Sequence, residues 1–160
     1  MTILKNIRKA TEADIAFIKE LETRPANRFV YTSEADEHQA NMANRNFLYL
    51  IGEDTAGNRL AYAMLLYATA TDGNPTVEWR RIITNKPGGG TGRLFMKMVL
   101  QHLTEAGRAK RVWLDVFEGN EGAIRLYKTF GFRETGRSTA ETALADKASG
   151  TLIILEHSLL

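Results

Sequence analysis

Four glycines crowd five positions near the middle of this chain, at Gly88, Gly89, Gly90 and Gly92. The apolar residues from 77 to 84 predict a strand before them, and an amphipathic run that starts near Leu94 predicts a helix after them. Glycine allows positive φ and close approach to the backbone. The free N–H groups and dipole of the following helix would suit a phosphate or pyrophosphate. Taken alone, the stretch is equally consistent with a flexible connection between strand and helix.

Composition excludes several kinds of chemistry. The chain has no cysteine, which rules out disulfides, thiolate metal sites and a thioester intermediate on the protein. Its three histidines, His38, His102 and His157, are dispersed, so no metal site is predicted. A net charge of +2 with scattered basic residues argues against a nucleic-acid partner.

Length and hydropathy predict one domain over residues 1–160, with a mixed α/β fold. No apolar run approaches the roughly 18 residues of a membrane span, and no hydrophobic signal core is visible. A cytoplasmic protein without a membrane partner is therefore expected.

Periodicity predicts four helices and seven strands. The predicted helices cover residues 12–22, 33–44, 94–106 and 123–130. The predicted strands cover residues 3–9, 47–51, 60–67, 77–84, 111–116, a segment from 132 onward, and 151–155. Residues 139–149 are expected to form a polar connection. The second helix has a thin apolar face and is expected on the surface.

Two common phosphate-binding devices fit the glycines badly. The ATP-binding P-loop needs Lys and Ser or Thr directly after its last glycine, and here Arg93 and Leu94 follow. The dinucleotide fingerprint would place Arg93 at its third glycine and belongs to an opening β-α-β unit. The glycines here come after several predicted strands.

From Val77 to about Gly136 the chain instead resembles the GNAT superfamily, the acyl-CoA-dependent N-acetyltransferases. Three features in the expected order carry the resemblance: the strand Glu78–Thr84 that leads to Gly90-Thr-Gly92-Arg93, the strand end Asp115-Val116 before Asn120, and the run Asn120-x-x-Ala123-x-x-x-Tyr127-x-x-x-Gly131-Phe132. The resemblance implies an α/β (α+β) fold. Its mixed sheet of six to seven strands would be flanked by about four helices, with splayed central strands forming an acyl-CoA cleft.

The resemblance also implies which residues bind acetyl-CoA. Backbone N–H groups of the glycine loop would hold the pyrophosphate, and the backbone of the preceding strand would pair with the pantetheine arm and the thioester carbonyl. The implied residues are Ile82, Ile83, Thr84, Lys86, Gly88, Gly89, Gly90, Thr91, Gly92, Arg93, Asn120 and Tyr127. Pro87 occupies a position where the family has Gln or Arg, and Gly89 one that is often basic, so Lys86 would supply the charge.

Two residues are implied to be catalytic. Tyr127 matches the family's general acid, which protonates the departing thiolate; its place on an apolar stripe is also typical of a core aromatic residue. Glu78 matches a general base, and the alternative is a surface carboxylate paired with Arg80 or Arg111. Asn120 would contact the pantetheine arm, cap a helix, or do both.

The expected acceptor is a small-molecule amine or a peptide, attacked directly in a ternary complex. In the family, the acceptor cleft lies between the first two helices and the last strands, here residues 24–44 and 138–151. Candidate lining residues are Arg24, Arg28, Phe29, Tyr31 and Trp79. Glu34, Asp36 and Glu37 are explained by a helix N-terminus, and no dense acidic cluster marks a polyamine site. A homodimer is left open.

Two other classes of function remain at this point. One is an acyl-CoA-binding regulatory module without catalysis, which the departures at Pro87 and Gly89 favour. The other is a nucleotide- or phosphate-binding domain of different fold, in which the glycine loop binds another anion.

Overall fold

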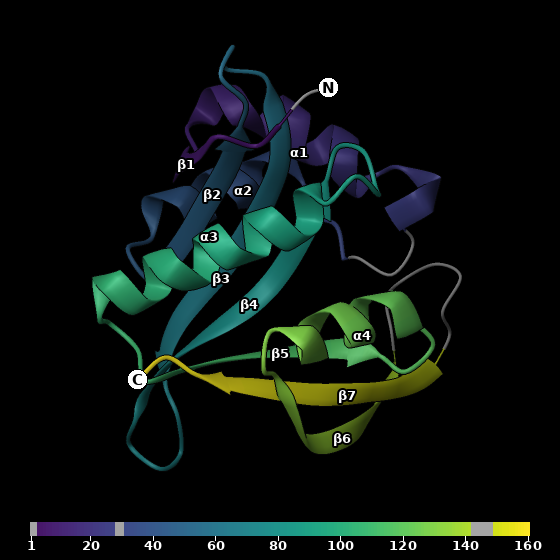
Figure 1. The fold of residues 1–160 in the computed structure, drawn as a ribbon. Helices are drawn as coiled ribbons and strands as arrows, with labels where there is room; N and C mark the ends of the chain where they lie inside the picture. The colour runs from purple at the N-terminus through teal and green to yellow at the C-terminus, as the bar shows by residue number, and fades with distance from the viewer. Residues whose placement is uncertain (1–2, 28–30, 142–148) are drawn as a thin grey trace.

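The computed structural model describes residues 3–27, 31–141 and 149–160. These residues form a seven-stranded sheet in the order β1-β2-β3-β4-β5-β7-β6 (Figure 1). The strands are β1 (Asn6–Lys9), β2 (Phe47–Glu53), β3 (Arg59–Thr69), β4 (Pro75–Thr84), β5 (Arg111–Phe117), β6 (Arg133–Glu141) and β7 (Ser149–Ser158). The helices are α1 (Ile15–Glu22), α2 (Ala35–Ala43), α3 (Thr91–Ala106) and α4 (Glu121–Thr129), with 3₁₀ turns η1 (Glu12–Asp14) and η2 (Pro25–Asn27).

The pairing of the two central strands ends early. All neighbouring strands are antiparallel except β4 and β5, which are parallel. Their register covers only Thr76↔Arg111 to Glu78↔Trp113. Beyond these residues the strands diverge, as Figure 1 shows. The mixed sheet with splayed central strands is confirmed.

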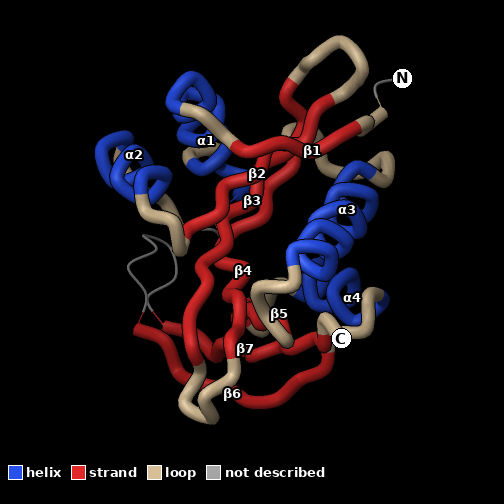
Figure 2. The backbone as a smooth tube through the Cα atoms, turned by 90° about the vertical axis from the view of Figure 1, so that its left-hand side faces the viewer, coloured by secondary structure: helices blue, strands red, loops and turns tan. Residues whose placement is uncertain are grey.

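Helices cover both faces of the sheet. Figure 2 shows α1 and α2 on one side, with α3 and α4 on the other. Helix α3 buries Phe95, Met96, Val99 and Leu103, which recur at helical spacing and fill the larger core. Gly107 ends the helix with φ 64°, in the left-handed region that glycine adopts without steric cost. The predicted helix over residues 94–106 is confirmed, and it begins three residues earlier, at Thr91.

A β-bulge in β4 sends the side chains of Trp79 and Arg81, two positions apart, to opposite faces of the sheet. Leu65 pairs with Trp79 and Met64 pairs with Arg81, which leaves Arg80 as the extra residue. In a regular strand, residues 79 and 81 would share a face. Here Trp79 packs in the α3 and α4 core, while Arg81 reaches Glu22 of α1. Backbone irregularity, not alternation, decides which face Arg81 occupies.

Several element ends differ from the sequence prediction. The first strand begins at Asn6, and the first helix begins with η1, where the Asp14 carboxylate accepts the Thr11 N–H at 2.7 Å. Strand β6 extends to Glu141 and β7 begins at Ser149, so the predicted connection over 139–149 was too long. Both strands continue because each supplies the other's backbone hydrogen bonds, which outweighs their polar composition.

Candidate active site

A cavity of about 320 Å³ lies where β4 and β5 diverge. Its walls are β4 from Trp79 to Thr84 and β5 from Leu114 to Phe117. Helix α4 and the segment before α2 close it, through residues that include Ala26, Asn27, Tyr31, Asn120 and Tyr127. The cavity therefore collects side chains from both halves of the chain. We call this cavity the cleft.

The β4 edge offers unpaired backbone groups to the cleft. The Asn85 N–H donates to the Leu60 carbonyl at 2.7 Å, on the β3 side of β4. Because backbone groups alternate along a strand, the N–H and C=O groups of Ile82 and Thr84 point away from β3. β5 no longer pairs with β4 at this level. An extended ligand can thus pair with β4 as a neighbouring strand would.

One end of the cleft is the N-terminus of α3. The first helical hydrogen bond runs from the Leu94 N–H to the Gly90 carbonyl at 3.1 Å, and no side chain caps the helix. The N–H groups of Thr91, Gly92 and Arg93 thus have no partner within the helix. Gly92 lines the cleft. This end of the cleft fits an anion, since free N–H groups and the helix dipole coincide there.

The loop before α3 turns left-handed over three consecutive residues. Gly88, Gly89 and Gly90 have φ of +86°, +69° and +83°. Any other residue would adopt this backbone only with strain. The positive φ of Gly89 thus explains why this chain has a glycine at a position where the family often has a basic residue.

Replacing Gly90 by Ala is expected to lower the free energy of unfolding by about 1 kcal/mol and to weaken binding of an anion at α3. A Cβ at Gly90 would meet no atom within 4 Å, so strain alone causes the loss. Gly119→Ala is the matched control, because that Cβ also meets nothing and Gly119 is not among the glycines with positive φ. Denaturant unfolding and ligand titration of both variants measure the difference. Equal losses in the two would contradict the strain.

Tyr127 of α4 combines a buried ring with a free hydroxyl. The side chain is 8% exposed and its ring lies 5.9 Å from that of Phe132. Tyr127 lines the cleft, and its hydroxyl has no hydrogen-bond partner among the described residues. Burial raises the pKa of Tyr127 to about 12. At neutral pH the hydroxyl is thus protonated and available to donate its proton.

The carboxylates of Glu78 and Asp115 and the guanidinium of Arg80 lie near the point where β4 and β5 diverge. Asp115 of β5 lines the cleft, whereas Glu78 lies just before the splay, with its carboxylate 3.8 Å from Arg80 Nε. Loss of hydration raises the pKa of both carboxyl groups; the Arg80 charge opposes this, and the Asp115 charge raises the pKa of Glu78 further. Arg111 pairs with other carboxylates, those of Asp72 and Glu156. Both carboxylates are suited to accept a proton.

Asp115 had no assigned role in the sequence analysis. Its signal was a single carboxylate within the apolar strand Arg111–Phe117, on the face opposite Val112, Leu114 and Val116. Alternation indicates an exposed residue, and the Asp115 side chain is exposed in the structure. Only the divergence of β4 and β5 turns that face into a cleft wall.

The comparison with protein families decides the assignment. The model of the Acetyltransferase (GNAT) family matches residues 15–132. The chain belongs to the GNAT family. The match includes the splayed strands, the glycine loop and α4.

Solved GNAT structures share the whole fold at low sequence identity. A mutant of the spermidine N-acetyltransferase SpeG from Vibrio cholerae superposes with a TM-score of 0.80 at 18% identity, over 96% of this chain and 93% of that one. A ribosomal-protein-alanine N-acetyltransferase from Brucella melitensis gives 0.76 at 22% identity, over 96% and 99%. At such identities the similarity establishes the fold alone.

A curated relative is closer in sequence but over a short stretch. The spermine/spermidine N(1)-acetyltransferase of Bacillus subtilis (strain 168) is 47% identical over 49 residues. That stretch is 31% of this chain and 32% of the relative, so the match spans about a third of the relative's length.

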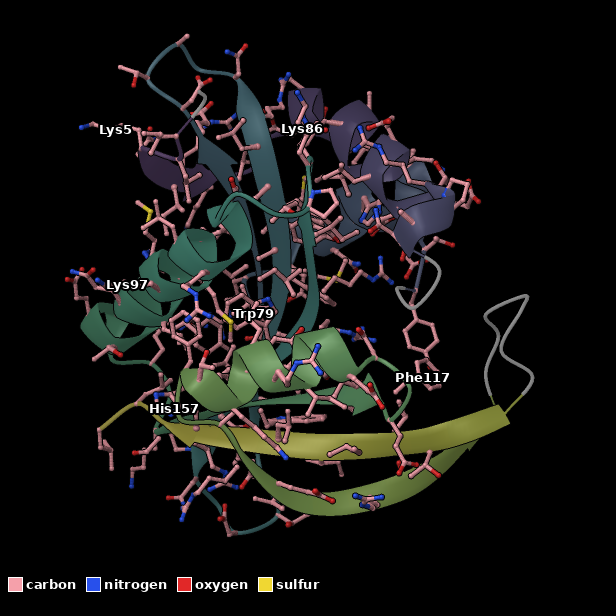
Figure 3. The ribbon with its side chains drawn as sticks, turned by 45° about the vertical axis from the view of Figure 1, so that its right-hand side comes forward. Lys5, Trp79, Lys86, Lys97, Phe117 and His157 are labelled. Carbon is pink, nitrogen blue, oxygen red and sulfur yellow. The ribbon has the colours of Figure 1, made fainter. Side chains whose placement is uncertain are left out.

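The implied acetyl-CoA residues divide between two cavities of this GNAT chain. Ile82, Ile83, Thr84, Gly92, Asn120 and Tyr127 line the cleft. Lys86, Gly88, Gly89 and Thr91 line a second cavity of about 850 Å³, beside Phe17 and Glu20 of α1. Figure 3 shows Lys86 beyond the end of β4, far from Trp79. Gly90 is the N-cap of α3, and Arg93 lies 5.9 Å from the centre of the Phe130 ring. Asn120 is the N-cap of α4, although its side chain makes no capping hydrogen bond.

The residues expected to line the acceptor side lie in different places. Tyr31 and Trp79 line the cleft. Arg24 does not, because its guanidinium binds the Glu20 carboxylate and the carbonyl oxygen of Asn85. Arg28 and Phe29 lie outside the described residues. Within residues 3–27, 31–141 and 149–160, no three His, Asp or Glu side chains cluster as metal ligands, and no helix is long and apolar enough to cross a membrane.

Proposed function

We propose that this GNAT protein transfers an acetyl group from acetyl-CoA to a primary amine of a small molecule or peptide. The observation that carries the proposal is a single cleft that joins the uncapped N-terminus of α3 to Tyr127 and Asp115. The β4 edge, the anion site and the proton donor are the groups that thioester aminolysis requires.

The backbone holds the donor in this proposal. The N–H groups of Thr91, Gly92 and Arg93 bind the pyrophosphate, and the edge at Ile82 and Thr84 pairs with the pantetheine arm. A backbone N–H of this edge also stabilises the oxyanion that forms on the thioester carbonyl. These donors are fixed before the reaction, so little reorganisation is needed. Binding therefore depends mainly on the backbone and not on a side chain at Pro87.

The chemical step requires two proton transfers. The neutral amine attacks the thioester carbonyl, the N–C bond forms, and the C–S bond then breaks. The ammonium proton passes to Asp115 or Glu78, and the Tyr127 hydroxyl protonates the departing thiolate. A side-chain amine with a pKa near 10.4 is mostly protonated at neutral pH. A nearby carboxylate that accepts a proton therefore matters most for such an amine.

Polyamines are the first acceptors to test, since the B. subtilis relative carries the name spermine/spermidine N(1)-acetyltransferase. Asp115 and Glu78 supply negative charge beside the cleft for a cationic amine. Arg80 offsets part of that charge. Amino acids and peptide N-termini therefore belong in the same acceptor panel.

The test is release of free thiol from acetyl-CoA in the presence of spermidine, spermine, single amino acids and short peptides. The expected result is release that depends on at least one amine, with mass spectrometry finding one added acetyl group on it. Melting temperatures with acetyl-CoA, ATP and NAD provide the control. A rise with acetyl-CoA but no thiol release would favour a silent binding module, and a rise only with ATP or NAD would contradict acyl-CoA binding.

A further inference from the structure

A cluster of buried polar groups lies behind the cleft, on the α1 and α2 face of the sheet. The Glu22 carboxylate, on the last residue of α1, accepts hydrogen bonds from His38 Nε2 at 2.8 Å, the Tyr62 hydroxyl at 2.9 Å and the Arg81 guanidinium at 2.7 Å. We call Glu22, His38, Tyr49, Tyr62 and Arg81 the Glu22 network. None of the five is more than 9% exposed.

The network defines the state of His38. Because Glu22 can only accept, His38 Nε2 must carry a proton. His38 Nδ1 lies 2.7 Å from the Tyr49 hydroxyl, which in turn accepts from Asn41 Nδ2 at 3.1 Å. Both ring nitrogens of His38 and both carboxylate oxygens of Glu22 therefore have a hydrogen-bond partner. These bonds hold the His38 ring and the Glu22 carboxylate in one orientation.

The network joins both ends of one cleft wall. Glu22 lies just before one end of the wall, and near the other end the Ser33 N–H donates to Glu22 Oε1 at 3.4 Å. Between these two points are Ala26, Asn27 and Tyr31, which line the cleft. We call residues 24–27 and 31–34 the wall segment.

Arg81 connects the same network to the floor of the cleft. Its side chain is directed to Glu22 by the bulge at Arg80, and Arg81 also lines the cleft. The N–H groups proposed for the pyrophosphate belong to the N-terminus of α3, and those proposed for the pantetheine arm belong to Ile82 and Thr84. The side chains of the network contact neither the α3 N-terminus nor the glycine loop, and they adjoin Ala26, Asn27 and Tyr31, the cleft residues that remain for the amine.

We propose that the Glu22 network is a positioning device for the acceptor: it holds the wall segment against Arg81 and so determines the affinity for the amine. The inference rests on the proposed acetyl transfer and adds residues that do not touch the reacting atoms. Its basis is the combination of burial, hydrogen bonds to both oxygens of the Glu22 carboxylate, and contact near both ends of the wall segment.

His38→Phe tests this, since it keeps an aromatic ring and removes both ring nitrogens. It is expected to raise KM for the amine about tenfold, because a misplaced wall no longer positions the amine, with KM for acetyl-CoA unchanged. Amide hydrogen exchange in residues 24–27 and 31–34 is expected to become faster. His38→Gln can still donate to Glu22 from its amide nitrogen and is expected to restore part of both properties.

Asp14→Asn is the matched control. Asp14 is 1% exposed and its carboxylate binds Arg8 at 2.8 Å and Arg59 at 2.6 Å, at the other end of α1 and away from the cleft. This variant is expected to lower the melting temperature while leaving both KM values and the exchange of the wall segment unchanged.

Three outcomes would overturn the inference. One is a parallel rise of both KM values in His38→Phe. The second is an equal change in His38→Phe and Asp14→Asn, which would indicate a purely structural role. The third is unchanged exchange in the wall segment. Exchange needs no turnover, so it decides whether the network positions the wall even if the wild type acetylates no amine and the proposed function fails.

Discussion

Tyr127→Phe is expected to lower kcat by about 10²- to 10³-fold, within the range that general acids contribute. The KM for acetyl-CoA should change little, because the ring remains in its packing against Phe132. Stability should also change little, since the hydroxyl has no partner to lose among the described residues. Steady-state kinetics and thermal unfolding together measure these effects.

Tyr67→Phe is the matched control for this change. Tyr67 is also 8% exposed and belongs to the same core, but it lies outside the cleft, with its ring under Arg108. It should leave kcat unchanged. Full activity of Tyr127→Phe would show that solvent protonates the thiolate and that Tyr127 is only a core residue.

Asp115→Asn is expected to lower kcat by about 10²-fold and to remove the acidic limb of the pH profile, if Asp115 is the base. A base must be deprotonated, so the rate falls as pH falls through its pKa. Partial loss of hydration within the cleft raises the pKa of Asp115, which places this limb at higher pH than an ordinary aspartate would. Profiles of kcat against pH for Asp115→Asn and Glu78→Gln measure the effect.

Glu78 and Asp115 predict different pH profiles for the two variants. If Glu78 is the base, Glu78→Gln removes the limb and Asp115→Asn moves it to lower pH, because the Asp115 charge raises the pKa of Glu78. If Asp115 is the base, only Asp115→Asn removes it. A limb that survives in both variants would place the base elsewhere. These results would separate a residue within the cleft from one at its edge.

Much of the fold could be predicted because its signals are local. Helix α3 follows from apolar residues at helical spacing and a terminating Gly107. The run from Asn120 to Phe132 places Tyr127 on α4 within one short segment. The ends of β6 and β7 were predicted less well, since each strand extends through bonds to the other and not through its own composition.

The site depended more on distant contacts. His38 carried no signal, because its partners Glu22 and Tyr49 are separated from it by 16 and 11 positions and Arg81 is farther still. Lys86, the expected source of charge for the pyrophosphate, lines the cavity beside α1. Its neighbours there, Phe17 and Glu20, lie more than 60 positions away in the sequence, so no local pattern indicates this location.

The sequence by itself determined the order of elements, the glycine loop and the family motifs, because propensity, periodicity and turn chemistry act over a few residues. Only the tertiary structure decided which side chains share the cleft. The early end of β4–β5 pairing opens that cleft, and the bulge at Arg80 assigns Trp79 and Arg81 to opposite faces. Both are properties of strand pairing, in which each backbone group finds its partner on another segment of the chain.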